Sequence, residues 1–456
     1  MIKMMNLSEA NYIVGIDVTE NEATISYIDQ KSLKPIIYDR SGGYGQVSIP
    51  TVMQYVIEEK AWLIGEHANM NRNVEGTLIV DHLLEILLNK EEVEIGGEKI
   101  CPERLLFIYI ENILESFKQL NPHATISSLS LALPDRYYHD IINEVENGLK
   151  AFENIKLNVV MSSQAVFEWL QYIKQPFKGR TLIFDYSYNN FATSRLETKD
   201  DTIHLDLISS KPEIAISDVE KVFIEELNLQ YQHHLKLQHL SKEELLNIKQ
   251  MLIEQEQWIF QKYAKKQSAK VYYSFAYPPF QKVLNYKRMD ELIMPFRIKL
   301  EKFIDQFAQF DQVILIGKGC KLQWPVDIIS EKMNVLALNP YEVVSNGCCL
   351  IAAHHIIKQD EIKFNIQQKE YGIMVEVNEK VIFSPLNNHA NHFIIDFEDE
   401  SEASLDIMRK DKENNFKIEQ TISLNNALAL HNKIRINLKL TKVDEDTTIK
   451  IEYLPM

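Results

Sequence analysis

Residues 12–29, YIVGIDVTENEATISYID, constrain the fold of this chain more than any other stretch. An apolar run ends at a carboxylate, Asp17, and a short polar turn follows it. The run after the turn alternates apolar with hydroxyl side chains, the pattern of a strand with one buried face. The stretch therefore predicts a β-hairpin with Asp17 at the tip of its first strand.

Helices alternate with apolar strands over the next segments, which is typical of an α/β domain. The apolar run TLIVDHLLEILL within residues 75–90 predicts a helix, and a second helix follows a proline at its first position. A strand followed by a hairpin partner occurs again in the second half, so the sequence predicts the same strand and hairpin arrangement in both halves. The other expected elements are helix 102–120, strand 127–133, helix 139–152, and hairpin strands 181–184 and 192–196.

The middle of the chain, residues 216–310, is expected to be mostly helical. One helix is predicted over 216–227 and another over 241–266, where Ser241 followed by Glu244 forms a capping box. The segment 268–280, SAKVYYSFAYPPF, alternates like a strand and is rich in aromatic residues.

Helical character ends near residue 357, and strand-like segments follow one another to the C-terminus. Short strands separated by polar turns are the pattern of a β-sandwich. The expected strands are IKFNI, YGIMVEV, KVIFSPL, HFIIDFE, FKIEQTISL, IRINLKL and TTIKIEYL.

The length and net charge of the chain limit its domain number and the classes of partner that it can bind. A chain of 456 residues suits two or three domains, and its net charge of −16 argues against nucleic acid or an anionic membrane as the main partner. The sequence lacks an apolar run of membrane-spanning length and an apolar stretch near its first residue, so we expect a cytoplasmic protein. The four cysteines and the clustered histidines lack metal-ligand spacing, so no metal site is expected from them.

Several motifs, taken in order, resemble the heat-shock 70 kDa chaperone family of the actin-like ATPase superfamily. They are SIPTVMQY (48–55), LIGEHA (63–68), LSLALPDRYYHD (129–140), TLIFDYSYNNFATSRL (181–196), VILIGKGCKLQWP (313–325) and NPYEVVSNGCCLIAA (339–353), after the first hairpin. The resemblance implies an α/β, ribonuclease H-like duplicated domain over residues 1–357, with halves of about 1–175 and 176–357. It also implies a helical closing subdomain over about 216–310, and a β-sandwich resembling a substrate-binding domain, without the helical lid, over 362–456.

The resemblance also assigns a nucleotide cleft. Asp17 and Asp185 would hold a hydrated magnesium ion. The remaining cofactor-binding positions, in the adenosine motif, are Gly317, Lys318, Gly319 and Lys321.

Both phosphate loops depart from the family pattern. Glu20 and Glu22 stand in the first loop, where negative charge opposes phosphate oxygens. Bulky residues replace the glycines of the second loop and block close backbone approach to a phosphate. These residues are Ser187, Tyr188 and Asn189.

The catalytic groups of the family are also missing. No lysine lies near Asp81 and His82, where the phosphate-contacting lysine is expected, and Ser162 replaces the catalytic glutamate. Losing several such groups together removes transition-state stabilisation. We therefore expect no catalytic residues, no bound cofactor and a pseudo-ATPase.

The sequence thus predicts a catalytically degenerate, chaperone-like scaffold that binds a protein client or partner, and it leaves the oligomeric state open. One alternative is an active, divergent ATP-dependent chaperone, in which ATP or ADP with magnesium binds a rebuilt site that uses Asn189, Asn190 and Lys318. A second alternative is an actin-like filament or cell-organisation protein.

Overall fold

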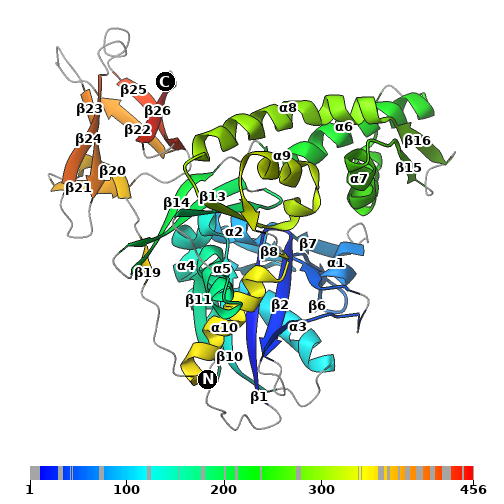
Figure 1. Ribbon diagram of the computed structural model, residues 1–456, viewed down its shortest axis with the longest axis horizontal. Coiled ribbons are helices and arrows are strands. Elements are labelled where there is room, and N and C mark those ends of the chain that lie inside the picture. The colour runs from blue at the N-terminus through cyan, green and yellow to red at the C-terminus, as the bar shows by residue number, and fades with distance from the viewer. Residues whose placement is uncertain are drawn as a thin grey trace. The chain divides into compact units, whose positions relative to one another are not determined.

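The chain divides into two compact units, Met1–Phe364 and Asn365–Met456. The first is a mixed α/β unit, and the described residues of the second are mostly strands (Figure 1). The computed structural model describes residues 11–28, 34–41, 43, 45–70, 76–120, 125–152, 154–175, 180–189, 191–199, 202–210, 214–236, 239–273, 279–336, 338–339, 341–357, 364–366, 370–377, 380–385, 391–396, 404–410, 416–423, 433–443 and 446–454.

The first sheet contains the predicted N-terminal hairpin, which is confirmed. Its strands are, in spatial order, β11 (Lys156–Met161), β10 (Thr125–Leu133), β1 (Asn11–Val18), β2 (Glu22–Ile28) and β3 (Pro35–Ile37), with β4 (Ser48–Pro50) paired to β2. The strands β11, β10 and β1 are parallel, whereas β1–β2 and β2–β3 are antiparallel. Most of the side chains of β1 and β2 are buried, which explains the apolar character of the hairpin.

The second sheet repeats this arrangement with later strands. Its order begins β18 (Val335–Leu336), β17 (Gln312–Ile316), β12 (Arg180–Tyr186), β13 (Phe191–Lys199) and β14 (Thr202–Ser210). The strands β18, β17 and β12 are parallel, and the pairs β12–β13 and β13–β14 are antiparallel. Each half of the unit therefore places a central strand between a parallel neighbour and an antiparallel hairpin partner.

The helix α10 (Val343–Ile357) packs against β1, β10 and α5 (Ser162–Tyr172). A Cβ atom on Gly15 of β1 would lie 2.1 Å from the backbone nitrogen of Cys349, so only glycine permits this approach. Cys348 and Cys349 are fully buried, in agreement with the packing that joins this helix to the first sheet.

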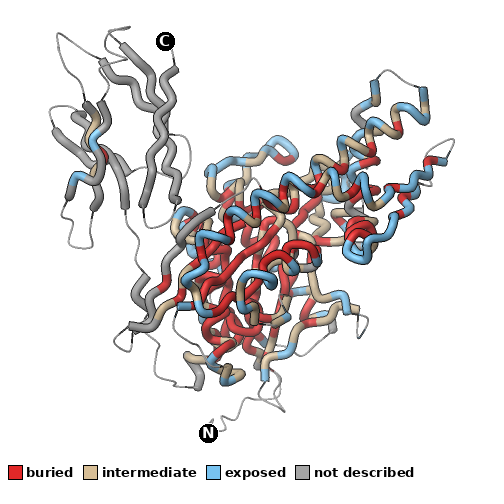
Figure 2. Tube along the Cα trace, turned by 45° about the horizontal axis from the view of Figure 1, so that its top comes forward, coloured by how far each residue is buried: buried red, intermediate tan, exposed pale blue. Residues whose placement is uncertain are grey.

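The remaining elements of the first unit surround the two sheets. Figure 2 shows the buried residues concentrated in the middle of the unit. They form two large apolar clusters, one in the first half and one that joins the second sheet to the middle helices. The additional elements are β5 (Met53–Val56), β6 (Ala61–Ile64), α1 (Glu66–Met70), β7 (Thr77–Val80), α2 (Leu83–Asn89), β8 (Val93–Ile95), β9 (Glu98–Ile100), α3 (Pro102–Leu120), α4 (Asp135–Leu149), η3 (Lys318–Lys321) and α9 (Trp324–Lys332).

A helical subdomain occupies the predicted middle segment. It consists of α6 (Ile216–Leu235), α7 (Lys242–Ala264), β15 (Ala269–Tyr273), β16 (Phe280–Leu284), α8 (Tyr286–Ile304) and η2 (Asp305–Phe307). The capping box is confirmed, because the Ser241 hydroxyl accepts from the Glu244 amide at 3.2 Å and Glu244 accepts from the Ser241 amide at 2.6 Å. The strands β15 and β16 form a two-stranded antiparallel sheet.

Strand-rich character continues to the C-terminus, and the seven predicted strand segments are confirmed as strands. Within the second unit, β21, β20, β23 and β24 form one antiparallel sheet, and β22, β25 and β26 form another. The strand β23 was not predicted. The strands are β19 (Phe364–Ile366), β20 (Glu370–Val377), β21 (Lys380–Pro385), β22 (Asn391–Asp396), β23 (Ser404–Lys410), β24 (Phe416–Ser423), β25 (Lys433–Val443) and β26 (Asp446–Leu454).

The helix predicted within residues 75–90 is wrong in its first part. The segment TLIV is the strand β7, which pairs with β5, and only residues 83–89 are helical. A short apolar run fits a buried strand as well as a helix, and the available edge of β5 decides between them.

Candidate functional site

Asp17 and Asp185 occupy equivalent places in the two sheets. Each is the next-to-last residue of its central strand, β1 or β12. Asp17 lies opposite Thr24 of its hairpin, and Asp185 lies opposite Ala192. The repeated topology thus brings together two carboxylates that are 168 positions apart in the sequence numbering.

These two side chains belong to a larger set of acidic groups, which we call the acidic cluster: Asp17, Glu20, Asp135 and Asp185. The other three members all raise the pKa of Asp185, which burial already raises well above its usual value. Burial also raises the pKa of Asp17 to about 7, with further contributions from Glu22 and Glu20. The Oδ1 atom of Asp17 is buried and has no hydrogen-bond partner among the described residues.

Glu20 lies in the turn between β1 and β2 and is the most deeply buried member of the cluster, at 1% exposure. Both of its carboxylate oxygens are buried. Burial raises its pKa, while a hydrogen bond from its own backbone amide, the positive charge of Arg136 and a hydrogen bond from Tyr137 lower the pKa. The sequence marked Glu20 as a group that repels phosphate, and the structure shows in addition that this carboxylate points into the protein.

Asp135 connects the two halves. Its Oδ1 accepts from the backbone amide of Ser163 at 3.0 Å, and its Oδ2 accepts from the hydroxyl of Ser194 at 2.6 Å. Burial raises the pKa of Asp135, and these two serines lower it. The segment LSLALPDRYYHD belongs to the family resemblance, but its aspartate was not predicted as a site residue. The only available signal was a carboxylate directly after a buried strand.

The loop after β12 is also attached to the first half. Arg136 donates from Nη1 to the backbone carbonyl of Asn189 at 3.0 Å, and the Asn189 amide donates to Glu85 of α2 at 3.3 Å. Ser187 donates to Asp185, and the Tyr188 hydroxyl donates to Glu220 of α6 at 2.7 Å. These loop groups are therefore engaged with the protein itself. Asn190 lies outside the described residues.

The glycines of the motif after β17 make room for Tyr186. A Cβ atom on Gly319 would lie 2.3 Å from the ring of Tyr186, and one on Gly317 would lie 2.5 Å from the backbone oxygen of the same residue. Gly317 also has a φ of 90°, which disfavours other residues. Lys318 and Lys321 are the first and last residues of η3.

Ser162 and the pair Asp81 and His82 occupy the positions that correspond to catalytic groups in the chaperone family, and their side chains contact other parts of the protein. The hydroxyl of Ser162 donates to the carbonyl oxygen of Leu133 at 3.0 Å. His82 has a left-handed backbone, with a φ of 56°, and its Nε2 lies 3.9 Å from a carboxylate oxygen of Asp81.

The described side chains offer little for direct metal ligation. Across the residues that the structure describes, no three histidine, cysteine, aspartate or glutamate side chains are grouped so that they could hold a metal ion. Magnesium, however, usually keeps several waters and needs few protein carboxylates. The unpartnered Oδ1 of Asp17 fits such an outer contact, whereas Asp185 already accepts from Ser187.

None of the described helices has both the length and the apolar character needed to cross a bilayer. In the comparison with protein families, residues 35–277 match a model described as "Family of unknown function (DUF5716) C-terminal". The matched segment includes α4, with Asp135, and the β12–β13 loop, but it begins after the first hairpin. None of the curated proteins matches the chain.

Proposed function

Because this chain belongs to the DUF5716 C-terminal family, whose description gives no function, we propose a function from the acidic cluster itself. The protein is a catalytically silent, chaperone-like scaffold that binds a protein partner and hydrolyses little or no ATP. The observation that carries the proposal is the burial of the Glu20 carboxylate in the turn where the resemblance expects phosphate.

The burial of Glu20 disfavours a bound phosphate for an electrostatic reason. A nucleotide phosphate near Glu20 would add negative charge to a region where Glu20, Asp135 and Asp17 already raise the pKa of Asp185. Buried like charges interact strongly because little water screens them. Arg136, the cation that acts on Glu20, already donates to the carbonyl of Asn189.

The repeated sheet order supports the finer fold assignment of this proposal, an actin-like duplication similar to the heat-shock 70 kDa chaperone body. The two antiparallel sheets of the second unit support a β-sandwich, which in that family grips extended peptides. A body of this kind retains its shape for binding after the phosphate loops have changed.

Isothermal calorimetry of the purified protein with ATP and ADP, in magnesium and in EDTA, tests the proposal. We expect no binding heat up to about 1 mM nucleotide. Binding tighter than about 10 μM, or about −6.8 kcal/mol, would overturn it. The variant Glu20→Gln serves as a matched comparison, because it removes the charge of the carboxylate at nearly constant size.

One observation favours the alternative of an active, divergent ATP-dependent chaperone. The Oδ1 atom of Asp17 is a buried acceptor without a described partner, as expected for a group that orders water around magnesium. A bound magnesium ion would neutralise phosphate charge there, and Asp17 and Asp185 would orient its water shell. Magnesium-dependent nucleotide binding that is lost in Asp17→Ala and Asp185→Ala would establish this alternative.

A further inference from the structure

The small sheet of the helical subdomain has one protected edge and one open edge. On β15, the side-chain amide of Gln255 donates to the carbonyl of Tyr272 at 2.7 Å and accepts from the amide of Tyr272 at 3.1 Å. A glutamine from α7 thus makes the two hydrogen bonds that a neighbouring strand would make. This edge of the sheet is closed.

The same contact fixes the direction of the backbone groups on β16. Residues alternate along an antiparallel pair between those bonded to the partner strand and those directed away from it. The backbone groups of Tyr272 point away from β16, toward Gln255. Its opposite residue, Gln281, therefore has backbone groups that point away from β15, toward the free edge of β16. The register is regular, so Val283 shares this orientation. In the described residues, β16 pairs with β15 alone.

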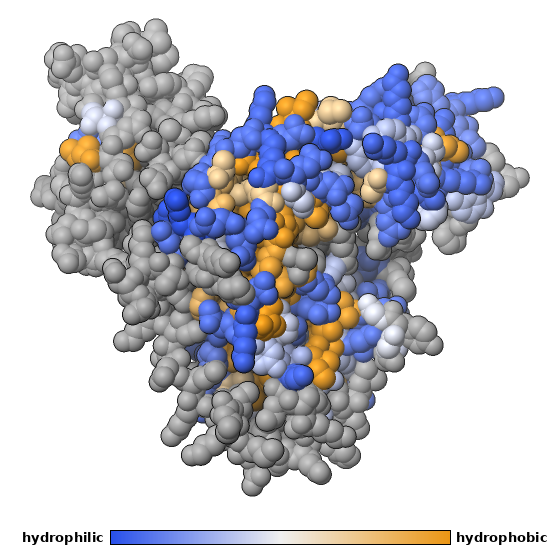
Figure 3. Space-filling view, viewed as in Figure 1, coloured by the Kyte–Doolittle hydropathy of each residue, from blue (hydrophilic) through white to orange (hydrophobic). Residues whose placement is uncertain are grey.

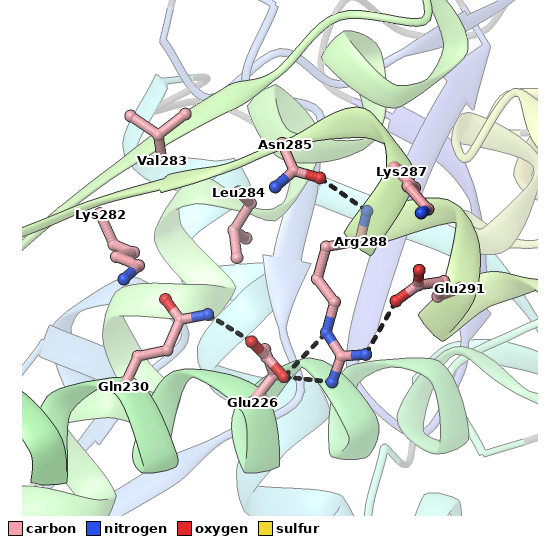
Figure 4. A pocket seen from close by; sticks show the side chains of 9 residues that line it. All are labelled: Glu226, Gln230, Lys282, Val283, Leu284, Asn285, Lys287, Arg288 and Glu291. Carbon is pink, nitrogen blue, oxygen red and sulfur yellow. Dashed lines mark hydrogen bonds and ion pairs between the residues drawn. The ribbon is translucent and has the colours of Figure 1, made fainter.

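A cavity of about 300 Å³ borders this open edge. Lys282, Val283 and Leu284 all line it, although neighbouring side chains of a strand point to opposite faces. A cavity lined by consecutive residues therefore adjoins the edge of the strand. Figure 4 shows the other lining residues on α6 and at the start of α8.

The acidic side chains that line this cavity are paired, whereas two of its basic side chains are not paired within the described part of the chain. Arg288 donates from Nε and Nη2 to Glu226, at 3.1 and 2.6 Å, and from Nη1 to Glu291 at 3.0 Å, so both acidic side chains of the lining are already paired. Lys282 and Lys287 are exposed and have no ion pair with any described residue. The lining thus carries three basic and two acidic side chains, in a chain whose net charge is −16.

From this geometry we infer that the open edge of β16 binds an extended, acidic segment of a partner protein as an additional strand. The backbone groups of Gln281 and Val283 pair with the segment, and its carboxylates lie beside Lys282 and Lys287, which stand on opposite sides of the cavity (Figure 4). Strand addition of this kind obtains affinity from main-chain hydrogen bonds and specificity from side-chain pockets.

Other occupants fit the surface less well. Pairing two copies of β16 edge to edge would bring the lysines of both copies together, and like charges across strands are unfavourable. An apolar helix needs a continuous apolar groove, whereas the face of the subdomain visible in Figure 3 is mostly hydrophilic. The side chain of Val283 is 53% exposed.

This inference deepens the proposed scaffold function and rests on it for the existence of a protein partner, but its test is independent of nucleotide. The probe is a fluorescent, acetylated hexapeptide that alternates valine with glutamate, titrated with the full-length protein and followed by fluorescence anisotropy. We expect saturable binding below about 1 mM. We also expect the affinity to fall at least about tenfold when the glutamates become lysines.

Two changes separate strand pairing from charge attraction alone. Methylation of the backbone nitrogens of the peptide removes donors without changing its charge, and Val283→Pro removes the outward amide of β16 without touching the ladder to β15. Each is expected to abolish saturation. Lys282→Glu is expected to weaken binding at least about tenfold, while Lys299→Glu, an exposed change farther along α8, leaves it unaltered.

Each other result overturns the inference. Absence of binding excludes the site, and equal binding of the methylated peptide reduces the effect to charge. A dimer in sedimentation that Val283→Pro dissolves would assign the edge to a second copy of the chain. Circular dichroism of every variant checks its folding. None of these outcomes decides whether nucleotide binds, so failure here is distinct from failure of the calorimetric test.

Discussion

The hydroxyl of Ser194 donates a 2.6 Å hydrogen bond to Asp135, and this bond joins β13 in the second half to the first turn of α4 in the first half. Both side chains are buried, at 4% and 5% exposure. A buried acceptor that loses its donor retains a desolvation cost that nothing compensates.

The first prediction concerns this contact. Ser194→Ala should lower the free energy of unfolding by about 1–3 kcal/mol, because one oxygen of Asp135 loses its partner. Urea denaturation at neutral pH measures the change. Ser330→Ala, an exposed serine at the surface of α9, is the control and should stay within about 0.5 kcal/mol of the parent. A similar effect for both variants would contradict a specific role for the bond.

The second prediction is a pH dependence caused by Asp17. Its pKa rises from 3.8 to about 7 on folding, so the folded state binds a proton that the unfolded state has released in this range. The stability that this proton contributes to the folded state is fully present below pH 3.8, the pKa in the unfolded chain. It is lost as the pH rises through about 7, the pKa in the folded protein. The loss amounts to at most about 4 kcal/mol.

Asp17→Asn should therefore reduce the decline in unfolding free energy between about pH 5 and pH 8. Denaturation curves at both pH values measure it. Asp39→Asn is the control, because the hydrogen bond from the Ser41 hydroxyl and those from backbone amides hold the pKa of Asp39 at about 2, outside this window. An unchanged decline in Asp17→Asn would show that other groups cause it.

The third prediction concerns Glu20. Its raised pKa means that folding must either bury a charge or take up a proton at any pH above the unfolded-state pKa. Glu20→Gln should stabilise the protein by about 1–3 kcal/mol near pH 8, since the amide carries no charge. Thermal unfolding compares it with Glu58→Gln, an exposed residue that should have little effect. Destabilisation by Glu20→Gln would mean that the carboxylate has a compensating partner.

The fourth prediction tests why glycine is needed after β17. Gly319→Ala should destabilise the protein by about 1–3 kcal/mol, because the added methyl group meets the ring of Tyr186 at 2.3 Å. Combining it with Tyr186→Leu should recover part of this loss. A double-mutant cycle in urea measures the coupling, and strictly additive effects would contradict the packing explanation.

The local sequence pattern was sufficient to predict many of the helices and strands. The hairpin of β1 and β2, the helix α3 and the capping box of Ser241 and Glu244 were predictable, since their determinants lie within a few residues of one another. The C-terminal strands other than β23 were predictable for the same reason. The segment TLIV was not, because a four-residue apolar run takes its conformation from the neighbour that it pairs with.

The candidate site was predictable only in part. The resemblance directed attention to Asp17, Asp185, Gly317 and Gly319, but it did not mark Asp135 or Tyr186. Asp135 meets a serine that is 59 positions away, and a bond across that separation has no local sequence signal.

The sequence by itself thus determined the periodic elements, the repeated strand and hairpin theme, and the acidic charge, because these depend on side-chain order and composition. Only the tertiary structure decided that Glu20 is buried, that Tyr186 packs against Gly319, and that Gln255 bonds to one edge of the small sheet. Each of these depends on segments brought together by packing, where burial alters the energy of a charge and steric contact limits the size of a residue.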